Sequence, residues 1–332
     1  FSNYYAIAQH QHERWSITPD DRILEFRSFS WASAHMLSLN PALLTGAALI
    51  FAKHFSRSRF LDWITEHKPT IIVAVPTVVN MLLESPPQNA ATTFDGVRFV
   101  SCSTAPLMPE QHRLFEDTYG VPLVQRYGMS EGGVVCANYP DTRRIGSVGK
   151  PGLYHNITIR DPQGNALPQG EVGEIALKGR VTPGYLNDAD ATADSRTGDG
   201  FFLTGDLGLL DDDGWVQFQG RRKELIKSGG INIAPAEIEA ALRSHEAVDS
   251  VFVTGLADDR LDEAIGAVVV LHPGAETDAA QLRAHCRLSL AAYKVPQYFA
   301  FVAANELPVT STEKLQRNRL HELFQRDRPR QD

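Results

Sequence analysis

The segment TIIVAV at residues 70–75 constrains the fold more than any other part of the chain. An uninterrupted run rich in β-branched residues is typical of a strand that is buried on both faces of a parallel sheet. Pro76 ends the run, because proline cannot donate a hydrogen bond to a strand ladder. The apolar residues of 78–83 then recur at helical spacing. The sequence therefore predicts a buried strand followed directly by a helix.

The same alternation of strands and helices extends through the first third of the chain. A helical pattern around 60–64 is stopped by Pro69, residues 97–100 form a second short apolar run, and a helical pattern at 110–119 is closed by Gly120. Strands that alternate with helices are typical of an α/β layer with parallel strands. The predicted fold class is therefore α/β.

The pattern changes after Gly132, where short apolar segments are separated by turn signals. The turns are DPQGN at 161–165, PQG at 168–170 and DDDG at 211–214. Clusters of Asp, Pro, Asn and Gly favour tight turns, so the segments between them read as short strands. The predicted strands cover residues 156–160, 174–178, 201–204 and 215–219. We expect a small β-rich subdomain over about 133–219.

A third pattern begins at Glu224. A glycine hairpin at 228–230 precedes a helix with Pro235 in its first turn, which is a favoured place for proline. The remaining predicted elements are strands at 250–254, 266–271 and 298–302 and a helix that starts at Asp278. This pattern indicates a compact α+β domain. We expect a partial large N-terminal domain at 1–222 and a mobile C-terminal domain at 223–332, joined by a tight connection near Lys223.

Composition excludes several classes of partner. With 32 Lys and Arg against 40 Asp and Glu, the formal net charge is −8, whereas proteins that bind DNA or RNA without sequence preference need a basic face. No apolar stretch reaches the ~20 residues that span a bilayer. Cys102, Cys136 and Cys286 are odd in number and lack metal-type spacing, which is typical of a reducing cytosol. We expect a cytoplasmic protein with a small-molecule partner and no nucleic acid or membrane span.

Four short motifs follow one another along the chain. They are YGMSE at 127–131, TGDL at 204–207, GRRKE at 220–224 and LPVTSTEKLQR at 307–317. Each motif alone is weak, but the ordered set resembles the adenylate-forming superfamily. That superfamily comprises acyl-CoA and aryl-CoA ligases, luciferases and the adenylation domains of peptide synthetases. The resemblance covers nearly the whole chain.

The resemblance implies a reaction in two halves. A carboxylate attacks the α-phosphorus of ATP and gives an acyl-adenylate and pyrophosphate. A thiol, usually that of coenzyme A, then attacks the activated carbonyl and releases AMP. The first half brings several negative charges together, so it requires Mg²⁺ and a positioned cation. The implied cofactors and substrates are ATP or AMP, Mg²⁺, coenzyme A and a small carboxylic acid.

Most of the implied nucleotide site lies in the first domain. By resemblance, Glu131 is the Mg²⁺ ligand, Ser130 contacts phosphate and Tyr127 packs on adenine. The segment Ser103-Thr104-Ala105-Pro106 stands where relatives have their adenine loop. The full AMP/ATP set is Thr104, Ala105, Pro106, Tyr127, Gly128, Met129, Ser130, Asp206, Arg221 and Lys314, of which Lys314, Glu131 and Ser130 are the implied catalytic residues.

Asp206 and Arg221 are the implied ribose contacts. We expect Asp206 at the end of the predicted strand 201–204, where its carboxylate can accept charge-assisted hydrogen bonds from two ribose hydroxyls. Arg221 is implied as a second ribose or phosphate contact. A turn aspartate and a solvated arginine are the structural alternatives for these two residues.

Lys314 is the implied catalytic cation. A lysine ammonium is a compact charge on a flexible stem, suited to reaching the substrate carboxylate and the α-phosphate. Relatives usually have glycine before this lysine, whereas this chain has Glu313, which adds a negative charge and removes backbone freedom. A surface lysine before a helix is the structural alternative.

Lys223 stands at the position of the family hinge. Rotation there would exchange Lys314 for the glycine hairpin, whose small residues allow close approach of a pantetheine arm. The implied CoA contacts are Lys227, Ser228, Gly229 and Gly230. A plain hairpin turn is the alternative.

The sequence gives weaker signals for the acyl pocket. Phe29 and Trp31 lie where relatives carry a Pro-Leu-Phe-His segment, and Ser103 lies beside the adenine loop. These three residues are the candidates for the pocket wall. Phe29 and Trp31 are equally well explained as core aromatics.

The sequence also lacks one motif of the family. A Ser/Thr/Gly-rich phosphate loop ending in Pro-Lys-Gly does not occur in it, and residues 1–6 resemble the helix that follows this loop in relatives. We therefore expect a fragment without its N-terminal part. The predicted function is that of an AMP-forming carboxylic acid–CoA ligase. The alternatives are an adenylation enzyme that loads a carrier-protein thiol and a catalytically silent nucleotide- or protein-binding fragment.

Overall fold

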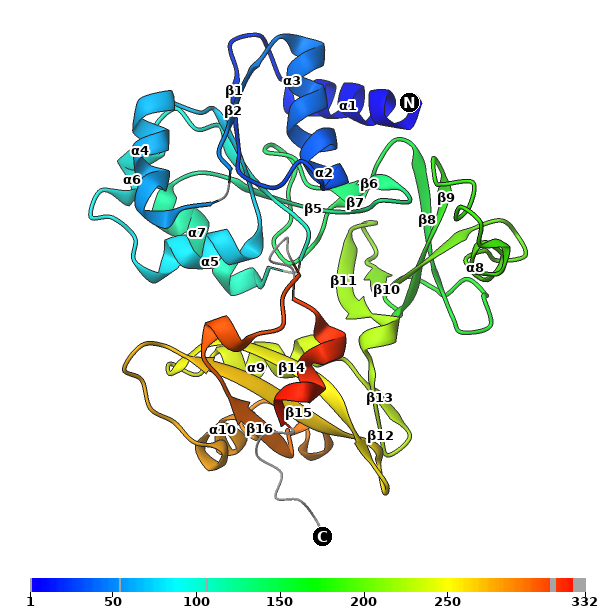
Figure 1. Ribbon diagram of the computed structural model, residues 1–332. Helices are drawn as coiled ribbons and strands as arrows, with labels where there is room; N and C mark the ends of the chain where they lie inside the picture. The colour runs from blue at the N-terminus through cyan, green and yellow to red at the C-terminus, as the bar shows by residue number, and fades with distance from the viewer. Residues whose placement is uncertain (1, 54, 106, 311–314, 325–332) are drawn as a thin grey trace. The chain divides into compact units, whose positions relative to one another are not determined.

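The computed structural model of the chain describes residues 2–53, 55–105, 107–310 and 315–324 (Figure 1). The chain divides into two compact units, Phe1–Phe218 and Gln219–Asp332. The boundary falls within strand β11 (Val216–Arg221). The predicted boundary and hinge at Lys223 lie a few residues further on and stay a prediction.

The first unit is built on a seven-stranded sheet with the order β2-β1-β3-β4-β5-β6-β7. Its strands are β1 (Arg22–Glu25), β2 (Ala48–Phe51), β3 (Ile71–Ala74), β4 (Phe99–Cys102), β5 (Leu123–Met129), β6 (Gly133–Ala137) and β7 (Lys150–Pro151). Strands β2 to β5 pair in parallel along this order, and β6 and β7 continue the sheet antiparallel. The predicted α/β class is confirmed.

Helices and a core cluster lie on each face of this sheet. The helical elements of the unit are α1 (Ser2–Trp15), α2 (Ala32–Ala34), the π-helix η1 (His35–Leu39), α3 (Asn40–Thr45), α4 (Arg57–His67), α5 (Pro76–Glu84), α6 (Ala90–Thr93), α7 (Pro109–Tyr119) and α8 (Ala189–Asp194). Alternate residues of β3 enter different clusters, since Ile72 packs with Phe60 and Phe115, whereas Ile71 packs with Trp15. Because side chains alternate along a strand, β3 is buried on both faces, as the sequence predicted.

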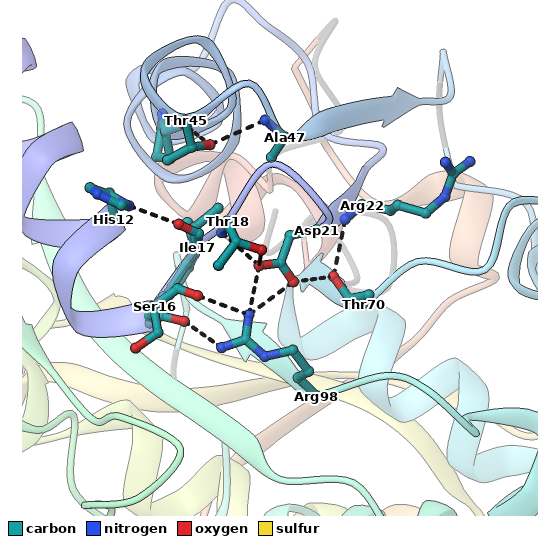
Figure 2. Close-up of polar contacts among 12 residues, drawn as sticks. His12, Ser16, Ile17, Thr18, Asp21, Arg22, Thr45, Ala47, Thr70 and Arg98 are labelled. Atoms are coloured by element: carbon teal, nitrogen blue, oxygen red, sulfur yellow. Dashed lines mark hydrogen bonds and ion pairs between the residues drawn. The ribbon is translucent and has the colours of Figure 1, made fainter.

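A network of polar contacts around Asp21 fastens the end of α1 to the sheet (Figure 2). The Asp21 carboxylate accepts hydrogen bonds from Thr70 Oγ1, from the backbone N–H of Thr18 and from Arg98 Nη1, at 2.8 and 2.9 Å for the two Arg98 contacts. Arg98 Nη2 also donates to the carbonyl of Trp15 at 2.6 Å. These contacts join α1 to the amino ends of β3 and β4, so they fix the helix whose side chains cover β5.

A four-stranded sheet completes the first unit. Its order is β11-β10-β9-β8, formed by β8 (His155–Arg160), β9 (Gly173–Gly179), β10 (Phe202–Leu210) and β11. Tyr127 of β5 belongs to the same core cluster as Ile175 and Phe202. The turns predicted between these strands are present, for example at Asp211, which accepts from the backbone of Asp213 and Trp215.

The structure corrects two strand predictions. The strand expected at 97–100 is observed as Phe99–Cys102, because its pairing with β3 starts at Phe99. The strand expected to end before Asp206 continues to Leu210. Gly205 has φ +73°, and this left-handed residue creates a bulge between Leu203 and Leu207 after which pairing with β9 resumes.

The second unit is a compact α+β domain, as predicted. Its strands are β12 (Ile226–Ser228), β13 (Ile231–Ile233), β14 (Val248–Asp258), β15 (Asp262–Leu271) and β16 (Tyr298–Phe301), and its helical elements are η2 (Arg222–Glu224), α9 (Pro235–Arg243), α10 (Ala279–Cys286), η3 (Ala292–Lys294), η4 (Ala304–Glu306) and η5 (Arg317–Phe324). The strand order is β13-β12-β15-β14, and β16 pairs with β15. Pro235 opens α9, and Asp278 caps α10 by accepting from two backbone N–H groups. Within the described part of the chain, none of the helices combines the length and apolar content needed to cross a bilayer.

Candidate functional site

Tyr127 and Asp206 form the centre of the candidate site. The Tyr127 hydroxyl donates to Asp206 Oδ2 at 2.6 Å, although 79 positions separate the two residues. Both are buried, with 8% and 4% of their surface exposed. Burial and the adjacent carboxylate raise the pKa of Tyr127 far above its usual value, so the phenol stays protonated and remains the donor. The structure thus brings two of the four motifs together.

The bulge of β10 presents Asp206 to this contact. The backbone N–H of Asp206 donates to Thr204 Oγ1 at 3.1 Å, and the N–H of Gly205 donates to Glu174 Oε1 at 2.8 Å. These bonds hold the bulge in one conformation. Asp206 therefore lies within a strand rather than at its end, which corrects the expected location but keeps the carboxylate beside Tyr127.

The end of β5 and the turn after it carry the rest of the YGMSE motif. A side chain at Gly128 would place its Cβ only 2.4 Å from the carbonyl oxygen of Gly133, so only glycine fits there. Met129 is half-buried against the β-rich core, and Ser130 is exposed. The half-buried carboxylate of Glu131 accepts a hydrogen bond from the Tyr185 hydroxyl at 3.1 Å.

Glu131 offers a single carboxylate, which is the kind of ligand that Mg²⁺ takes in nucleotide enzymes. Mg²⁺ usually takes one or two carboxylates and completes its shell with phosphate oxygens and water. Among the described residues, no group of three or more His, Cys, Asp or Glu side chains gathers to bind a metal by itself. Tyr185 engages one carboxylate oxygen of Glu131. The other oxygen would remain available to a metal ion that also binds the phosphates of a nucleotide.

The segment after β4 lies at the same edge of the sheet as this turn. Parallel strands end at one edge, and β4 and β5 pair in parallel. Ser103 is buried, whereas Thr104 and Ala105 are exposed, and Thr104 has φ +80°. A threonine in this left-handed region is strained, which is a frequent property of functional loops. Pro106 lies outside the described residues.

The candidates for the acyl pocket follow β1 at the same edge. Phe29 and Trp31 are half-buried. The Phe29 ring contacts the rings of His35 and Phe51, with centroids 6.1 and 5.9 Å away. Parallel pairing of β1 with β3 places their carboxyl ends together, so these aromatics share an edge with Ser103.

The remaining candidates belong to the second unit. Arg221 ends β11 and is half-buried, and Lys223 is exposed in η2. In the β12–β13 hairpin, Ser228 is buried, the side chain of Lys227 is exposed, and Gly229 and Gly230 have φ of +58° and +80°. The backbone N–H of Gly229 donates to Leu261 at 2.8 Å, which fixes the turn. Lys314 and Glu313 lie outside the described residues.

Three residues at the site were not identified from the sequence. Tyr185 contacts Glu131, Thr204 holds the bulge at Asp206, and Arg126 precedes Tyr127 on β5 and is buried. Tyr185 carries no sequence signal, because its role depends on a contact across the fold. Thr204 does carry one, since it opens the TGDL motif and accepts from the backbone two positions further on. Arg126 carries a weak one, since it lies between Val124 and Tyr127 and next to a family motif.

Comparison with known proteins adds independent findings. A family model described as "AMP-binding enzyme" matches residues 1–186, and a model described as "AMP-binding enzyme C-terminal domain" matches residues 237–314. The chain is 38% identical over 307 residues to the sulfoacetate–CoA ligase of Cupriavidus necator, covering 91% of this chain and 59% of the relative. It is 32% identical over 312 residues to the feruloyl-CoA synthase of an Amycolatopsis species, covering 93% of this chain and 62% of the relative.

The fold is also matched among solved structures. The ATP-bound crystal structure of MatB from Rhodopseudomonas palustris superposes with a TM-score of 0.89 at 32% identity, covering 96% of this chain and 63% of that one. The chain therefore spans about three fifths of the length of the proteins it resembles.

Proposed function

This chain belongs to the family of AMP-binding enzymes, and from that membership we propose that it forms part of an AMP-forming ligase that joins a carboxylic acid to coenzyme A. Similar proteins carry the names sulfoacetate–CoA ligase and feruloyl-CoA synthase, which supports a CoA thioester as the product. The acids in those two names differ widely, so the names alone leave the acid open.

The observation that carries the proposal is the buried hydrogen bond between Tyr127 and Asp206. It unites two motifs that the family resemblance assigns to one nucleotide. In the proposed complex the Tyr127 ring packs on adenine, and the carboxylate of Asp206, oriented by the phenol, accepts hydrogen bonds from the ribose hydroxyls. A fixed carboxylate gives strong, charge-assisted bonds because it needs no reorientation when the ligand arrives.

The proposed metal ligand is Glu131. Mg²⁺ bound there would neutralise charge that builds up on the phosphates during adenylate formation. Tyr185 holds the Glu131 carboxylate in place, and the exposed Ser130 hydroxyl is the proposed phosphate contact. Thr104 and Ala105, with Pro106, are the proposed adenine loop.

The second unit carries proposed residues for both half-reactions. Lys314 is the proposed cation for adenylation, and Arg221 the proposed ribose or phosphate contact. Lys227, Ser228, Gly229 and Gly230 are the proposed contacts of CoA, and Lys223 the proposed pivot between the two half-reactions. The cytoplasm is the proposed compartment, a choice supported by Cys102, Cys136 and Cys286, all of which are free thiols.

Calorimetric titration with AMP tests the nucleotide site in this chain. We expect saturable binding at one site. Asp206→Asn should weaken it at least tenfold, because a hydrogen bond to a charged group contributes about 1.5–3 kcal/mol. Asp190→Asn is the matched control, since Asp190 is exposed in the first turn of α8.

The possible results separate clearly. Equal affinity of wild-type protein and the Asp206→Asn variant would remove Asp206 from the nucleotide site. Absence of AMP binding by the folded wild-type chain would refute the proposed function of this polypeptide.

A further inference from the structure

A buried arginine lies between α1 and the large sheet, and the residues that the structure describes give it no counter-charge. Arg126 of β5 is 4% exposed. One of its nitrogens, Nη1, donates to Gln11 Oε1 at 2.7 Å, and its guanidinium carbon lies 3.9 Å from the ring centroid of Trp15. Its Nε and Nη2 atoms are buried and have no hydrogen-bond partner in the described part of the chain.

Further buried donors gather on the same face of the sheet. Ser101 pairs with Val124, and side chains two positions apart on a strand share a face, so Ser101 and Arg126 lie on the face of the sheet that packs against Trp15 of α1. Ser103 directly follows the end of β4. Both serine hydroxyls are buried and lack a partner among the residues that the structure describes. The same holds for Gln11 Nε2 and Trp15 Nε1, which come from α1.

The chemistry of these atoms points to an anion. The guanidinium, amide and indole nitrogens can only donate, and the two hydroxyls can donate. A buried donor left without an acceptor costs about 1–3 kcal/mol, and a buried charge left alone costs more. A ligand that supplies acceptor oxygens and a negative charge would satisfy the Arg126 guanidinium and could accept hydrogen bonds from donors beside it.

The other buried arginine of this region shows the difference. Arg27 is paired with the Glu25 carboxylate at 2.6 Å, and Glu25 also accepts from Ser38. Among the described residues, the Tyr139 phenol, the Arg27 cation and His10 interact electrostatically with Arg126, and none of these three groups carries a negative charge at neutral pH. Burial lowers the pKa of Arg126 to about 9, so the guanidinium is still charged near pH 7.

The position of Arg126 connects this anion to the acid. Arg126 directly precedes Tyr127, so the proposed adenine contact and the buried guanidinium are consecutive residues on opposite faces of β5. Ser103 belongs to both the candidate acyl pocket and the group of unsatisfied donors. An acid held in the candidate acyl pocket therefore approaches the unsatisfied donors from the side of Ser103.

We infer that Arg126, with Gln11, Trp15 and Ser103, binds a second anionic group on the acid substrate. The substrate class is a small carboxylic acid that carries a further carboxylate or a sulfonate. This inference rests on the proposed function and makes it narrower, because it excludes fatty and simple aromatic acids as good substrates.

Ligand binding by the 332-residue chain, saturated with AMP, tests the inference. The dianionic probes are malonate, succinate, glutarate and sulfoacetate, and the monoanionic probes of similar size are propionate, butyrate and pentanoate, all at equal ionic strength. We expect at least one dianion to bind ten times more tightly than every monoanion and to raise the thermal unfolding midpoint. The carboxylate and sulfonate arms decide which second group the site takes.

Arg126→Met should abolish the preference for dianions, whereas Arg126→Lys should retain part of it. Arg59→Met is the matched control, because Arg59 also stacks on a tryptophan, Trp63, but is exposed on α4. If Arg126→Met does not fold, Ser103→Val and the wild-type comparison of dianions with monoanions still decide the question, since the hydroxyl is expected to contribute to the preference.

Three results would overturn the inference in different ways. If the chain binds AMP but binds dianions and monoanions with equal affinity, the second-anion site is overturned and the proposed function stands. Absence of AMP binding would overturn the proposed function and with it the assignment of this site to an acid substrate. A preference for dianions that survives in Arg126→Met would show that another residue recognises the second anion.

Discussion

The Tyr127 hydroxyl donates a 2.6 Å hydrogen bond to Asp206 Oδ2 and so joins β5 to the bulge of β10. The contact is buried, so water cannot replace either partner cheaply. It also fixes the direction of a carboxylate that the strand alone would leave free to rotate. The Asp206 carboxylate thus takes part in a structural hydrogen bond and is also the proposed contact of the ribose.

Removing the phenol should affect both roles. Tyr127→Phe keeps the ring but leaves the buried Asp206 Oδ2 without this donor, so the free energy of unfolding should fall by about 1–3 kcal/mol. AMP affinity should fall severalfold, because the carboxylate loses its orientation. Urea unfolding and calorimetry measure the two effects.

Tyr119→Phe is the matched control for this experiment. The Tyr119 hydroxyl is buried and donates to the carbonyl of Leu82 at 2.7 Å, away from the proposed site. Its loss should lower stability to a similar extent and leave AMP affinity unchanged. Equal loss of AMP affinity in both variants would mean that destabilisation alone explains the effect.

Stability should fall in acid through Glu116. Burial raises the pKa of this carboxyl, but hydrogen bonds from His112, Arg143 and the Leu123 N–H outweigh it and lower the pKa to about 2. A folded-state pKa below the ordinary 4.5 means that stabilisation is present above pH 4.5 and is lost as the pH falls towards 2.

Glu116→Gln should therefore lose less stability than the wild-type protein between pH 6 and pH 3. Urea denaturation at both pH values gives the comparison. Glu110→Gln is the control, because Glu110 is exposed and lies 3.7 Å from its partner Arg113. A wild-type-like decline in the Glu116 variant would show that other carboxylates cause the acid loss.

Lys314→Ala tests the proposed adenylation cation. In an enzyme form active in both half-reactions, the variant should form acyl-adenylate about 10²–10³ times more slowly, since one preorganised transition-state contact contributes about 3–4 kcal/mol. Thioester formation from supplied acyl-adenylate should be nearly unchanged. Rapid-quench assays of each half-reaction measure this, and equal loss in both would refute a role confined to adenylation.

Lys223→Pro tests the proposed pivot. A pivot residue must change φ and ψ between two states, and proline holds φ near −65°. In the same enzyme form, acyl-adenylate should still be made while thioester release slows strongly. Single-turnover measurements of the two half-reactions decide this. Lys227→Pro is not a suitable control, because the backbone N–H of Lys227 donates to Glu263 and proline would remove that hydrogen bond. Wild-type rates for both steps would place the pivot elsewhere.

Local signals predicted much of the fold. The strand at 71–74 and the helix after it were predictable because Pro76 ends one element and opens the next. The helix capped by Asp278 was predictable because its side chain satisfies the free N–H groups of the first turn. Such elements depend on residues within a few positions of each other.

The missed features depend on distant pairing. The bulge at Asp206 arises because Gly205 takes a left-handed φ and β9 continues to pair beyond it, which turn signals do not reveal. The surroundings of Arg126 come from Gln11, 115 positions earlier. An arginine within a strand can be noticed in a sequence, but its hydrogen-bond partners depend on which residues the fold brings next to it.

The hydrophobic clusters of the two units are separate, and this determines where the chain can be cut. The hydrophobic clusters of the first unit use residues between Ile7 and Phe218, and those of the second use residues between Ile226 and Phe324. A protease cut at 219–225 would leave every cluster whole. Recombination at the same point would exchange one unit for another without dividing any of these clusters.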